Sequence, residues 1–292
     1  NIVISGYYGF TNTGDEAMLS AMLHDLRVID PDVRVTVISG NPADTRIRHQ
    51  VQAVYRLDMI EITKALAKCD LLISGGGSLL QDVTSDRSLF YYLSIMFLAK
   101  TLGKPVMLYG QGIGPLHGSV ARSAMRFVGN MVNQITVRDR GSCRELDDLG
   151  IHRPPIEVTA DPVLSMEPVD KAAGWKILKD HGIESGPVVG LFVREWKNLD
   201  YYKQVLAVVA DRLATEYGAH ILFVPMQEQD VLAAEKVFGF MKQPATIVQQ
   251  TYDTDRMLSL VGNLDMLIGI RLHALIFAAV MHVPLIGVSY DP

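Results

Sequence analysis

The feature that most constrains the fold is a series of short runs that are apolar at almost every position and end in glycine or a charged residue. Longer segments with helical periodicity, such as residues 15–29, separate these runs. Strands that are apolar on both sides have to be covered on both faces, which is typical of parallel sheets. Because parallel crossovers are right-handed, the alternation predicts a doubly wound α/β domain. The predicted strands lie in NIVISG, VRVTVISG, CDLLISGGG, KPVMLYGQGIG and QITVRDR.

The alternation restarts near residue 187 and predicts a second, smaller doubly wound domain. We therefore predict an N-terminal Rossmann-like domain over residues 1–165, a linker region with one helix-like run over residues 166–186, and a C-terminal Rossmann-like domain over residues 187–292. Two such domains facing across a cleft form a glycosyltransferase-B-like architecture, in which ligands bind where the carboxyl ends of the strands meet. A helix would normally follow the last strand, so we expect the second domain to be truncated. Its predicted strands are VVGLFV, AHILFVP, ATIVQ, DMLIGI and PLIGV, and its predicted helices span residues 198–217, 228–240, 253–262 and 272–281.

The composition narrows the functional classes. The chain has 292 residues, enough for two domains, and its formal net charge of −5 argues against general nucleic-acid binding. An anionic substrate would have to be bound by local basic clusters. Cys69 and Cys143 lie in no pairing motif, and no signal-peptide pattern opens the chain, so we expect a cytoplasmic protein.

The longest uncharged apolar stretch of the N-terminal half, SLFYYLSIMFLA at residues 88–99, is too short to span a bilayer. It favours a buried or interface helix. The alternative is peripheral contact with a membrane or with a lipid-linked substrate, at the inner face of the cell membrane. The sequence also leaves a homo-oligomer open.

The first candidate site is GYYGFTNTGDEAML, which joins a predicted strand to a predicted helix. Asn12 is suited to capping that helix, and Asp15 and Glu16 in its first turn complement the helix dipole, so a structural role explains these residues. A loop rich in glycine and tyrosine at the end of a strand also suits a sugar-hydroxyl site with Asp15 or Glu16 as the base. In this second interpretation Tyr8, Asn12, Gly14 and Asp15 bind the acceptor.

The second candidate is LLISGGGSLLQD, in which three glycines follow a predicted strand. Such a run exposes backbone N–H groups and suits a phosphate or a carboxylate. It lacks the Gly-Lys-Ser/Thr of a Walker A loop and the spacing of the dinucleotide fingerprint. A tight turn packed against a neighbour is the structural alternative; the functional interpretation assigns Gly76 and Gly77 to the acceptor site.

Arginines end two further predicted strands, Arg138 in ITVRDR and Arg194 in FVREW. A surface ion pair that caps the following helix would explain Arg138 structurally. The functional alternative is that Arg138 points toward an anion and is held by Asp139.

Arg271 and His273 interrupt the apolar run LDMLIGIRLHALIFAAVMHVPLIGV. A buried arginine without a partner is very costly, so the position needs a reason. Both residues stand at the predicted start of a helix, which attracts anions, and a guanidinium can clamp an anion with two hydrogen bonds. His273 can exchange a proton near neutral pH. The pair predicts a small, strongly anionic ligand. No metal-ligand spacing such as H-x-x-x-H or C-x-x-C occurs, so we predict no metal site.

Five motifs, taken together and in order, resemble the polysaccharide pyruvyl transferase family: GYYGFTNTGDEAML, CDLLISGGGSLLQD, GQGIGPL, VRDR and GIRLHALIFA. The similarity is greatest to the bacterial CsaB type. The resemblance implies a glycosyltransferase-B-like fold and transfer of pyruvate from phosphoenolpyruvate (PEP) to a sugar. For the CsaB type, it implies a lipid-linked acceptor that ends in N-acetylmannosamine and serves cell wall polysaccharide biosynthesis. The product, a 4,6-linked pyruvate ketal on this secondary cell wall polymer, serves S-layer anchoring.

The resemblance also assigns roles to residues. Arg271, Leu272 and His273 match the R-L-H motif of the family at the PEP site, and Arg138 is assigned to the same substrate. His273 would act as acid and base, Arg271 would stabilise charge, and a carboxylate of the TGDEA motif would orient or deprotonate the acceptor hydroxyl. PEP is the donor substrate, and no cofactor is implied. Two alternatives stay open: a nucleotide-sugar glycosyltransferase or epimerase on the same fold, and a non-catalytic sugar-binding module.

Overall fold

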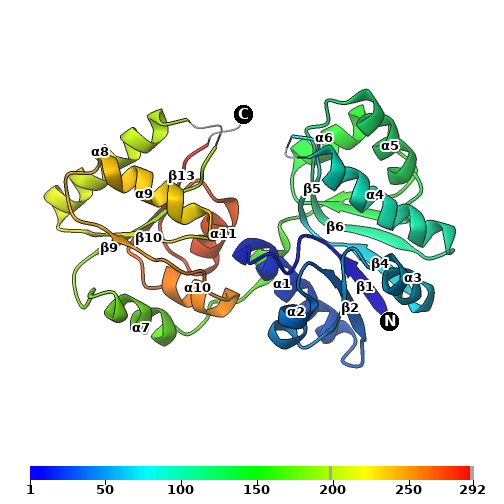
Figure 1. The fold of residues 1–292 in the computed structure, drawn as a ribbon, viewed down its shortest axis with the longest axis horizontal. Helices are drawn as coiled ribbons and strands as arrows, with labels where there is room; N and C mark the ends of the chain where they lie inside the picture. Colours follow the sequence, from blue (N-terminus) through cyan, green and yellow to red (C-terminus); the bar gives the residue numbers. More distant parts are fainter. Residues whose placement is uncertain (84, 197–198, 290–292) are drawn as a thin grey trace. The chain divides into compact units, whose positions relative to one another are not determined.

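The computed structural model describes residues 1–83, 85–196 and 199–289. Throughout this part of the chain, every strand pair is parallel. Helices alternate with the strands along the sequence (Figure 1). The predicted fold class, an α/β protein built on parallel sheets, is therefore confirmed.

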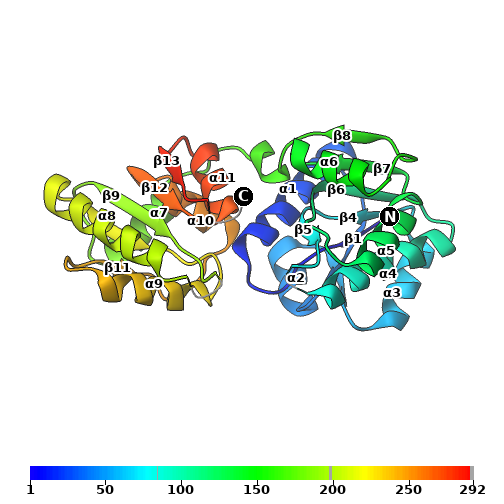
Figure 2. The ribbon, with the colours of Figure 1, turned by 90° about the horizontal axis from the view of Figure 1, so that it is seen from above.

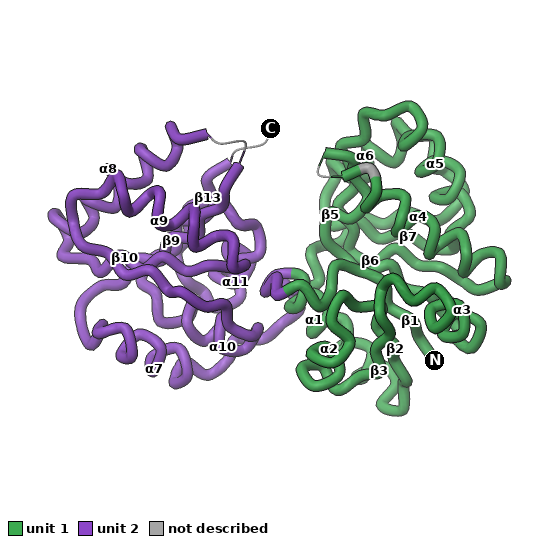
Figure 3. The backbone as a smooth tube through the Cα atoms, in the orientation of Figure 1, with its two compact units in different colours: residues 1–10, 15–162 green, residues 11–14, 163–292 purple. Residues whose placement is uncertain are grey.

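The chain divides into two compact units, each with its own sheet (Figure 3). Unit 1 contains residues 1–10 and 15–162, and unit 2 contains residues 11–14 and 163–292. The short segment 11–14 therefore groups with unit 2 although unit 1 surrounds it in sequence.

The sheet of unit 1 has the strand order β3-β2-β1-β4-β6-β7-β8, and β5 pairs with β6. The order reverses direction between β1 and β4, which is the switch point where open α/β sheets bind ligands. Ser5 and Ser74 end these two strands as direct register partners. The strands are β1 (Ile2–Ser5), β2 (Val35–Ser39), β3 (Gln52–Tyr55), β4 (Leu71–Ser74), β5 (Gly77–Leu80), β6 (Val106–Ile113), β7 (Gln134–Val137) and β8 (Ile156–Val158).

Helices cover both faces of this sheet. One face is covered by four helices, whose side chains Ile62, Leu89, Met125 and Leu146 are fully buried in one core cluster. The opposite face is covered by the first helix through a second core cluster that includes Leu19. The helices are α1 (Thr13–Ile29), α2 (Pro42–His49), α3 (Met59–Lys68), α4 (Asp86–Thr101), α5 (Ser119–Gly129) and α6 (Arg140–Asp148), and a 3-10 turn η1 (Pro162–Ser165) follows β8.

The apolar run at residues 88–99 forms most of α4. None of the helices in the described part of the chain is both long enough and apolar enough to span a lipid bilayer.

Unit 2 has a smaller sheet with the order β11-β10-β9-β12-β13, whose switch point lies between β9 and β12. Helices α8 and α9 cover one face through a core that includes Leu206 and Val237 (Figures 1 and 2). The strands are β9 (Val188–Phe192), β10 (His220–Phe223), β11 (Thr246–Ile247), β12 (Met266–Gly269) and β13 (Leu285–Gly287); the helices are α7 (Ala172–Asp180), α8 (Tyr201–Tyr217), α9 (Asp230–Phe240), α10 (Thr254–Val261) and α11 (Leu272–Val280).

Residues 166–186, treated above as a linker region, contain α7, which packs against α10. The backbone N–H of Gly174 donates to Ser259 Oγ at 2.8 Å, and a Cβ at Gly174 would overlap the Ser259 carbonyl. Glycine therefore allows the two helices to touch, and α7 groups with unit 2. The predicted helix start at residue 198 and the chain end at residues 290–292 lie outside the described residues.

Candidate active site

The Arg271–His273 motif lies where β12 ends, beside the switch point of unit 2. Arg271 is the N-cap residue of α11, and Leu272 and His273 begin the helix. The backbone N–H groups of this first turn point out of the N-terminal end of the helix, where they favour the binding of an anion. The side chain of Arg271 is only 14% exposed, so it needs a partner within the protein.

That partner is Asp230, the first residue of α9. Arg271 donates from Nε to Asp230 Oδ2 at 3.1 Å and from Nη2 to Asp230 Oδ1. The Oδ2 atom also accepts hydrogen bonds from the backbone N–H groups of Met226 and Gln227, both at 3.1 Å. Asp230 is buried, and the helix N-terminus favours its charge. The sequence analysis missed Asp230, because an acidic residue near a helix start is ordinary on sequence alone.

The motif segment at residues 11–14 lies in the same unit. Thr13 donates from its backbone N–H to the Met226 carbonyl at 3.1 Å and from Oγ1 to the Tyr252 carbonyl at 3.2 Å. Asn12 caps α1, since its Oδ1 accepts from the backbone N–H of Gly14 at 3.0 Å. A Cβ at Gly14 would overlap the His273 ring. Glycine at this position therefore allows His273 to lie against the start of α1.

Asp15 groups with unit 1, where its carboxylate approaches the glycine-rich run. Asp15 Oδ1 lies 3.2 Å from the position that a Cβ on Gly77 would occupy, and Gly77 has a φ of +92°. Both the backbone conformation and the close approach therefore require glycine at residue 77. A Cβ at Gly76 would lie 2.9 Å from Met18 Sδ, so this glycine packs closely against α1. The structure thus places Asp15 beside Gly77, and Met18 beside Gly76.

Glu16, in contrast, has partners for both carboxylate oxygens. Its Oε1 accepts from the backbone N–H of Gly9 at 2.8 Å, and its Oε2 lies 2.7 Å from His49 Nε2. Both side chains of the Glu16–His49 pair are fully buried. Glu16 therefore connects the loop after β1, through the Gly9 backbone, to the end of α2, through His49.

Tyr8 is also buried, and it lies against the backbone of the glycine-rich run. A Cβ at Gly6 or at Gly75 would overlap the Tyr8 side chain. Burial, together with the nearby charges of Asp15 and Glu16, raises the pKa of Tyr8 well above its ordinary value, so its phenol stays neutral. The structure therefore places this predicted acceptor-binding residue beneath the glycine-rich run.

Arg138 follows β7 and is held mainly by residues other than the neighbour that we predicted. It donates from Nη2 to Ser78 Oγ at 2.8 Å and from Nη1 to Asp161 Oδ2 at 3.3 Å, whereas its Nε lies 3.9 Å from Asp139. Asp139 instead caps α6 and accepts from the backbone N–H of Ser142 at 2.7 Å. The predicted pairing of Arg138 with Asp139 is present at 3.9 Å, but Asp161, 23 residues further on, makes the closer ion pair with Arg138.

A cluster of charges follows β9 in unit 2. Lys203 is fully buried and donates to Glu195 at 2.8 Å and to Asp200 at 3.0 Å, and Lys236 also donates to Glu195 at 2.8 Å. Burial alone would lower the pKa of Lys203, but the hydrogen bonds to Glu195 and Asp200 outweigh it and raise this pKa. The cation of Arg194 lies over the Trp196 ring at 5.1 Å. Sequence reasoning missed this cluster, since a lysine on a helix is usually exposed.

Each unit therefore contains its own set of candidate functional groups. In unit 2, a fixed guanidinium and the His273 imidazole lie at the start of α11 and suit an anion and a proton transfer. In unit 1, Asp15 lies beside Gly77, and Arg138 lies beside Ser78; these groups suit a hydroxyl and a further anionic group. Within the described ranges, no group of three histidines, cysteines or carboxylates is placed to hold a metal ion.

Solved structures identify the class of fold. The chain is similar to HepE from Anabaena in complex with UDP and glucose (TM-score 0.65, 10% identity, 98% of this chain and 80% of that one). It is similar to UDP-GlcNAc 2-epimerase from Neisseria meningitidis bound to UDP-GlcNAc (TM-score 0.64, 11% identity, 100% of this chain and 83% of that one). It is also similar to ADP-heptose heptosyltransferase II from E. coli (TM-score 0.58, 15% identity, 98% of this chain and 83% of that one). The fold is thus the glycosyltransferase-B type shared by glycosyltransferases and epimerases.

The family follows from the sequence itself. A family model described as polysaccharide pyruvyl transferase matches residues 12–292, so the chain belongs to the polysaccharide pyruvyl transferase family. The resemblance drawn from the five motifs is confirmed at this level. No curated protein matches the chain. Family membership supports a sugar-modifying transferase.

Proposed function

We propose that this protein transfers the pyruvyl group of PEP to two hydroxyls of a sugar, forming a cyclic ketal and releasing phosphate. Family membership supports a transferase of this kind. The observation that carries the PEP assignment is the buried Arg271–Asp230 pair at the start of α11, next to His273. A buried carboxylate that orients an arginine at a helix N-terminus suits a doubly anionic substrate.

Arg271 retains binding capacity beyond Asp230. A guanidinium has five N–H donors, and Asp230 accepts from Nε and from one hydrogen of Nη2. Three donors therefore remain for the phosphate or the carboxylate of PEP. Leu272 and His273 supply backbone N–H groups of the same helix turn, and Arg138 adds a second cation in this proposal.

The chemistry balances without a further reactant. His273 delivers a proton to C3 of PEP, which leaves an oxocarbenium-like centre at C2. One sugar hydroxyl attacks C2, the bond between C2 and the phosphate oxygen breaks, and a second hydroxyl closes the ketal. Of the two protons that the hydroxyls lose, one replaces the proton delivered to C3 and the other leaves with the phosphate. Acid–base catalysis of this kind typically contributes about 10²–10⁴-fold.

The acceptor is assigned to unit 1. Asp15 orients or deprotonates the acceptor hydroxyl in this proposal, because its carboxylate lies beside Gly77 of the glycine-rich run. The resemblance of the five sequence motifs to the CsaB type motivates a finer proposal: the acceptor ends in N-acetylmannosamine, is lipid-linked and serves a secondary cell wall polymer. The ketal would then serve S-layer anchoring.

The first experiment measures equilibrium binding of PEP through the shift that PEP causes in the thermal unfolding of the protein. PEP at a hundredfold excess over its Kd should stabilise the protein by about 2.7 kcal/mol. Arg271→Lys keeps a charge beside Asp230 but loses the planar fork, so it should weaken PEP binding at least about tenfold. Arg256→Ala is the matched control, since Arg256, like Arg271, lies near the start of a helix in unit 2 but is exposed. Unchanged PEP affinity in Arg271→Lys would remove Arg271 from the site.

A nucleotide-sugar enzyme is the second candidate, because two of the similar structures contain UDP or UDP-GlcNAc. The same binding experiment with UDP and UDP-sugars separates the two functions. Stabilisation by UDP and not by PEP would overturn the pyruvyl transfer proposal. Stabilisation by PEP, with phosphate release once a sugar acceptor is added, would support it.

A further inference from the structure

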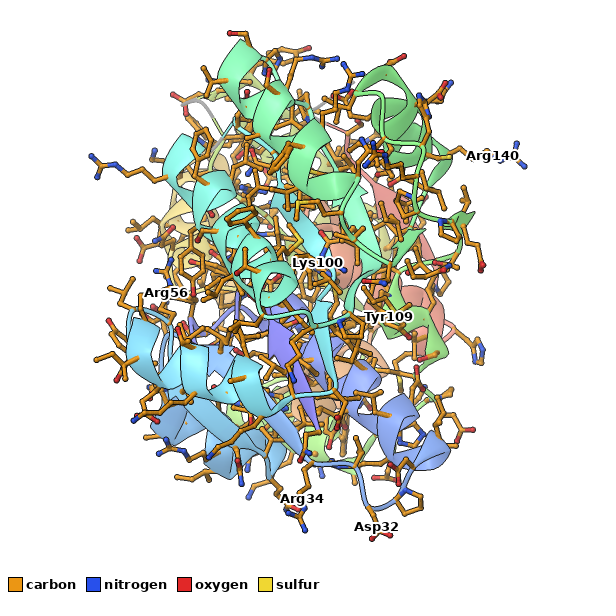
Figure 4. All side chains as sticks on the ribbon, turned by 90° about the vertical axis from the view of Figure 1, so that its right-hand side faces the viewer. Asp32, Arg34, Arg56, Lys100, Tyr109 and Arg140 are labelled. Carbon is orange, nitrogen blue, oxygen red and sulfur yellow. The ribbon has the colours of Figure 1, made fainter. Side chains whose placement is uncertain are left out.

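Two helices on one side of unit 1 present an apolar and basic surface to solvent. Helices α4 and α5 pack against each other and against the same face of the sheet (Figure 1). Figure 4 looks onto this side of the unit, with Lys100 labelled near the end of α4. We define the α4–α5 face by its exposed apolar and basic side chains: Arg87, Phe90, Phe97, Val120, Arg126 and Phe127.

The apolar side chains of this face form a regular pattern. Phe90 and Phe97 are seven residues apart on α4, and Val120 and Phe127 are seven residues apart on α5. Seven residues correspond to two helical turns, or about 10 Å, so each pair lies on one side of its helix. Both helices connect neighbouring parallel strands, so they run in the same direction, and the two pairs lie side by side. The Phe97 and Phe127 rings are in contact, with centroids 6.1 Å apart.

These four apolar side chains are largely exposed to solvent. Their exposed fractions lie between 39% and 69%, although both helices bury other residues in the core. Between Phe90 and Phe97 the exposed residue is Ser94, and between Val120 and Phe127 the exposed residues are Ser123 and Arg126. The surface is thus a small apolar patch that includes a basic residue, and exposed apolar patches mark contact sites.

The exposed charges that belong to the face are opposite in sign to the charge of the chain. They are those of Arg87 and Arg126, whereas Arg122 of α5 is paired with Glu145 of α6. The whole chain has a formal net charge of −5. A cationic face on an acidic protein favours an anionic surface, and exposed phenylalanines favour the interface of a bilayer.

We propose that the α4–α5 face docks on an anionic lipid membrane, with the three phenylalanines in the headgroup region and Arg87 and Arg126 against the lipid phosphates. The face binds peripherally, since neither helix is suited to spanning a bilayer. A second copy of the chain is a weaker match. A twofold contact would place the arginines of both copies at one interface, where like charges repel.

The inference concerns a surface remote in sequence from Arg271 and does not depend on the proposed activity. Its test therefore measures lipid binding alone, by flotation of the full chain with vesicles. Vesicles of phosphatidylcholine are compared with vesicles of equal parts phosphatidylcholine and phosphatidylglycerol. Binding should require phosphatidylglycerol and should fall as NaCl rises from about 0.1 M to about 0.5 M, because salt screens the attraction.

Variants locate the binding face. The double variant F97S/F127S should weaken binding at least about tenfold, because it removes most of the apolar contact. R87Q and R126Q should each weaken it about fivefold, in keeping with the contribution of one cation near an anionic surface. The matched control is F238S/F240S, which replaces two comparably exposed phenylalanines of α9 in unit 2. That control should bind as the wild type does.

Two results would overturn the proposal. One is binding that does not distinguish the two vesicle types, or that F97S/F127S leaves unchanged. The other is sedimentation equilibrium showing a dimer that F97S/F127S dissociates, which would assign the face to a second copy. Circular dichroism and thermal unfolding of each variant confirm that the fold is retained, which is expected because the substituted side chains are exposed.

Discussion

Replacing Asp230 with alanine tests the arrangement on which the anion site depends. Asp230 accepts four hydrogen bonds, two from Arg271 and one each from the backbone N–H groups of Met226 and Gln227. The substitution therefore leaves a guanidinium without its counter-ion and two backbone donors without an acceptor. All of these groups lie in unit 2.

The expected loss follows from burial. Removing one partner of a buried ion pair costs about 3–5 kcal/mol, and the 14% exposure of Arg271 places this pair at the lower end, about 3 kcal/mol. The backbone N–H of Met226 is buried, and leaving it without an acceptor adds about 1 kcal/mol. We therefore expect Asp230→Ala to lower the free energy of unfolding by about 4 kcal/mol, a large share of the stability of a typical domain.

The assay is urea-induced unfolding followed by tryptophan fluorescence. Both tryptophans of the chain, Trp175 and Trp196, lie in unit 2, so the signal reports on the unit that contains Asp230. Asp253→Ala is the matched control. Asp253 also caps a helix in unit 2, accepts from the Arg256 backbone N–H at 2.9 Å and pairs with the Arg256 side chain, but its own side chain is 43% exposed. It should lose only about 1 kcal/mol.

A double-mutant cycle isolates the pair. Adding Arg271→Ala to Asp230→Ala should cost little more, because the arginine has already lost its partner, and the interaction energy should be about 2–3 kcal/mol. A loss in Asp230→Ala no larger than that in Asp253→Ala would refute the reasoning, since the pair would then be no stronger than a surface contact. So would additive losses in the cycle.

Two further predictions concern single contacts. Gly14→Ala should reduce phosphate release at least about tenfold, because the new methyl group displaces His273. The control is Gly239→Ala in α9, where open space surrounds the new Cβ. This control should retain activity and gain up to about 1 kcal/mol of stability. For Asp82, burial opposes ionisation, but hydrogen bonds from two backbone N–H groups and the His117 side chain outweigh it and hold the pKa below the ordinary 3.8. A lowered carboxyl pKa stabilises the fold above the unfolded pKa, so Asp82→Asn should be less stable than wild type at about pH 6, and the difference in unfolding free energy should shrink as the pH falls below about 3.

The sequence predicted the fold because the central strands are apolar on both sides. The runs around β1, β2, β4, β6 and β7 stand out for this reason. Among the described strands, those that it did not predict are β3 and β8, at the two edges of the sheet, and β5, which pairs with β6 outside the main strand order. An edge strand is covered less completely, so QAVY and IEV carry no continuous apolar run. These segments form strands because they pair with the neighbouring strands of the sheet, which their own sequences do not show.

Residues of the candidate site were predictable only where a charged residue interrupts an apolar stretch of sequence. Arg271 stands out because it is a charge in an apolar run, and a buried charge requires a partner. The partner itself was not predictable: Asp230 lies 41 residues away, at an ordinary helix start. The same holds for Asp161 beside Arg138. Sequence spacing shows that a partner must exist, but the tertiary fold decides which carboxylate it is.

Asp15 and Glu16 are adjacent in sequence, yet the structure separates their roles. Glu16 accepts from the Gly9 backbone and pairs with His49 in a fully buried position, so Glu16→Gln should lose about 2–3 kcal/mol of stability and retain turnover per folded molecule. Asp15 lies beside Gly77, so Asp15→Asn should reduce phosphate release about 100-fold or more. Its affinity for PEP should stay unchanged, because Arg271 and Asp230 are intact. The paired measurement is phosphate release at saturating PEP and the free energy of unfolding for both variants. Loss of turnover in folded Glu16→Gln, with full turnover in Asp15→Asn, would reverse the assignment and make the buried glutamate the base.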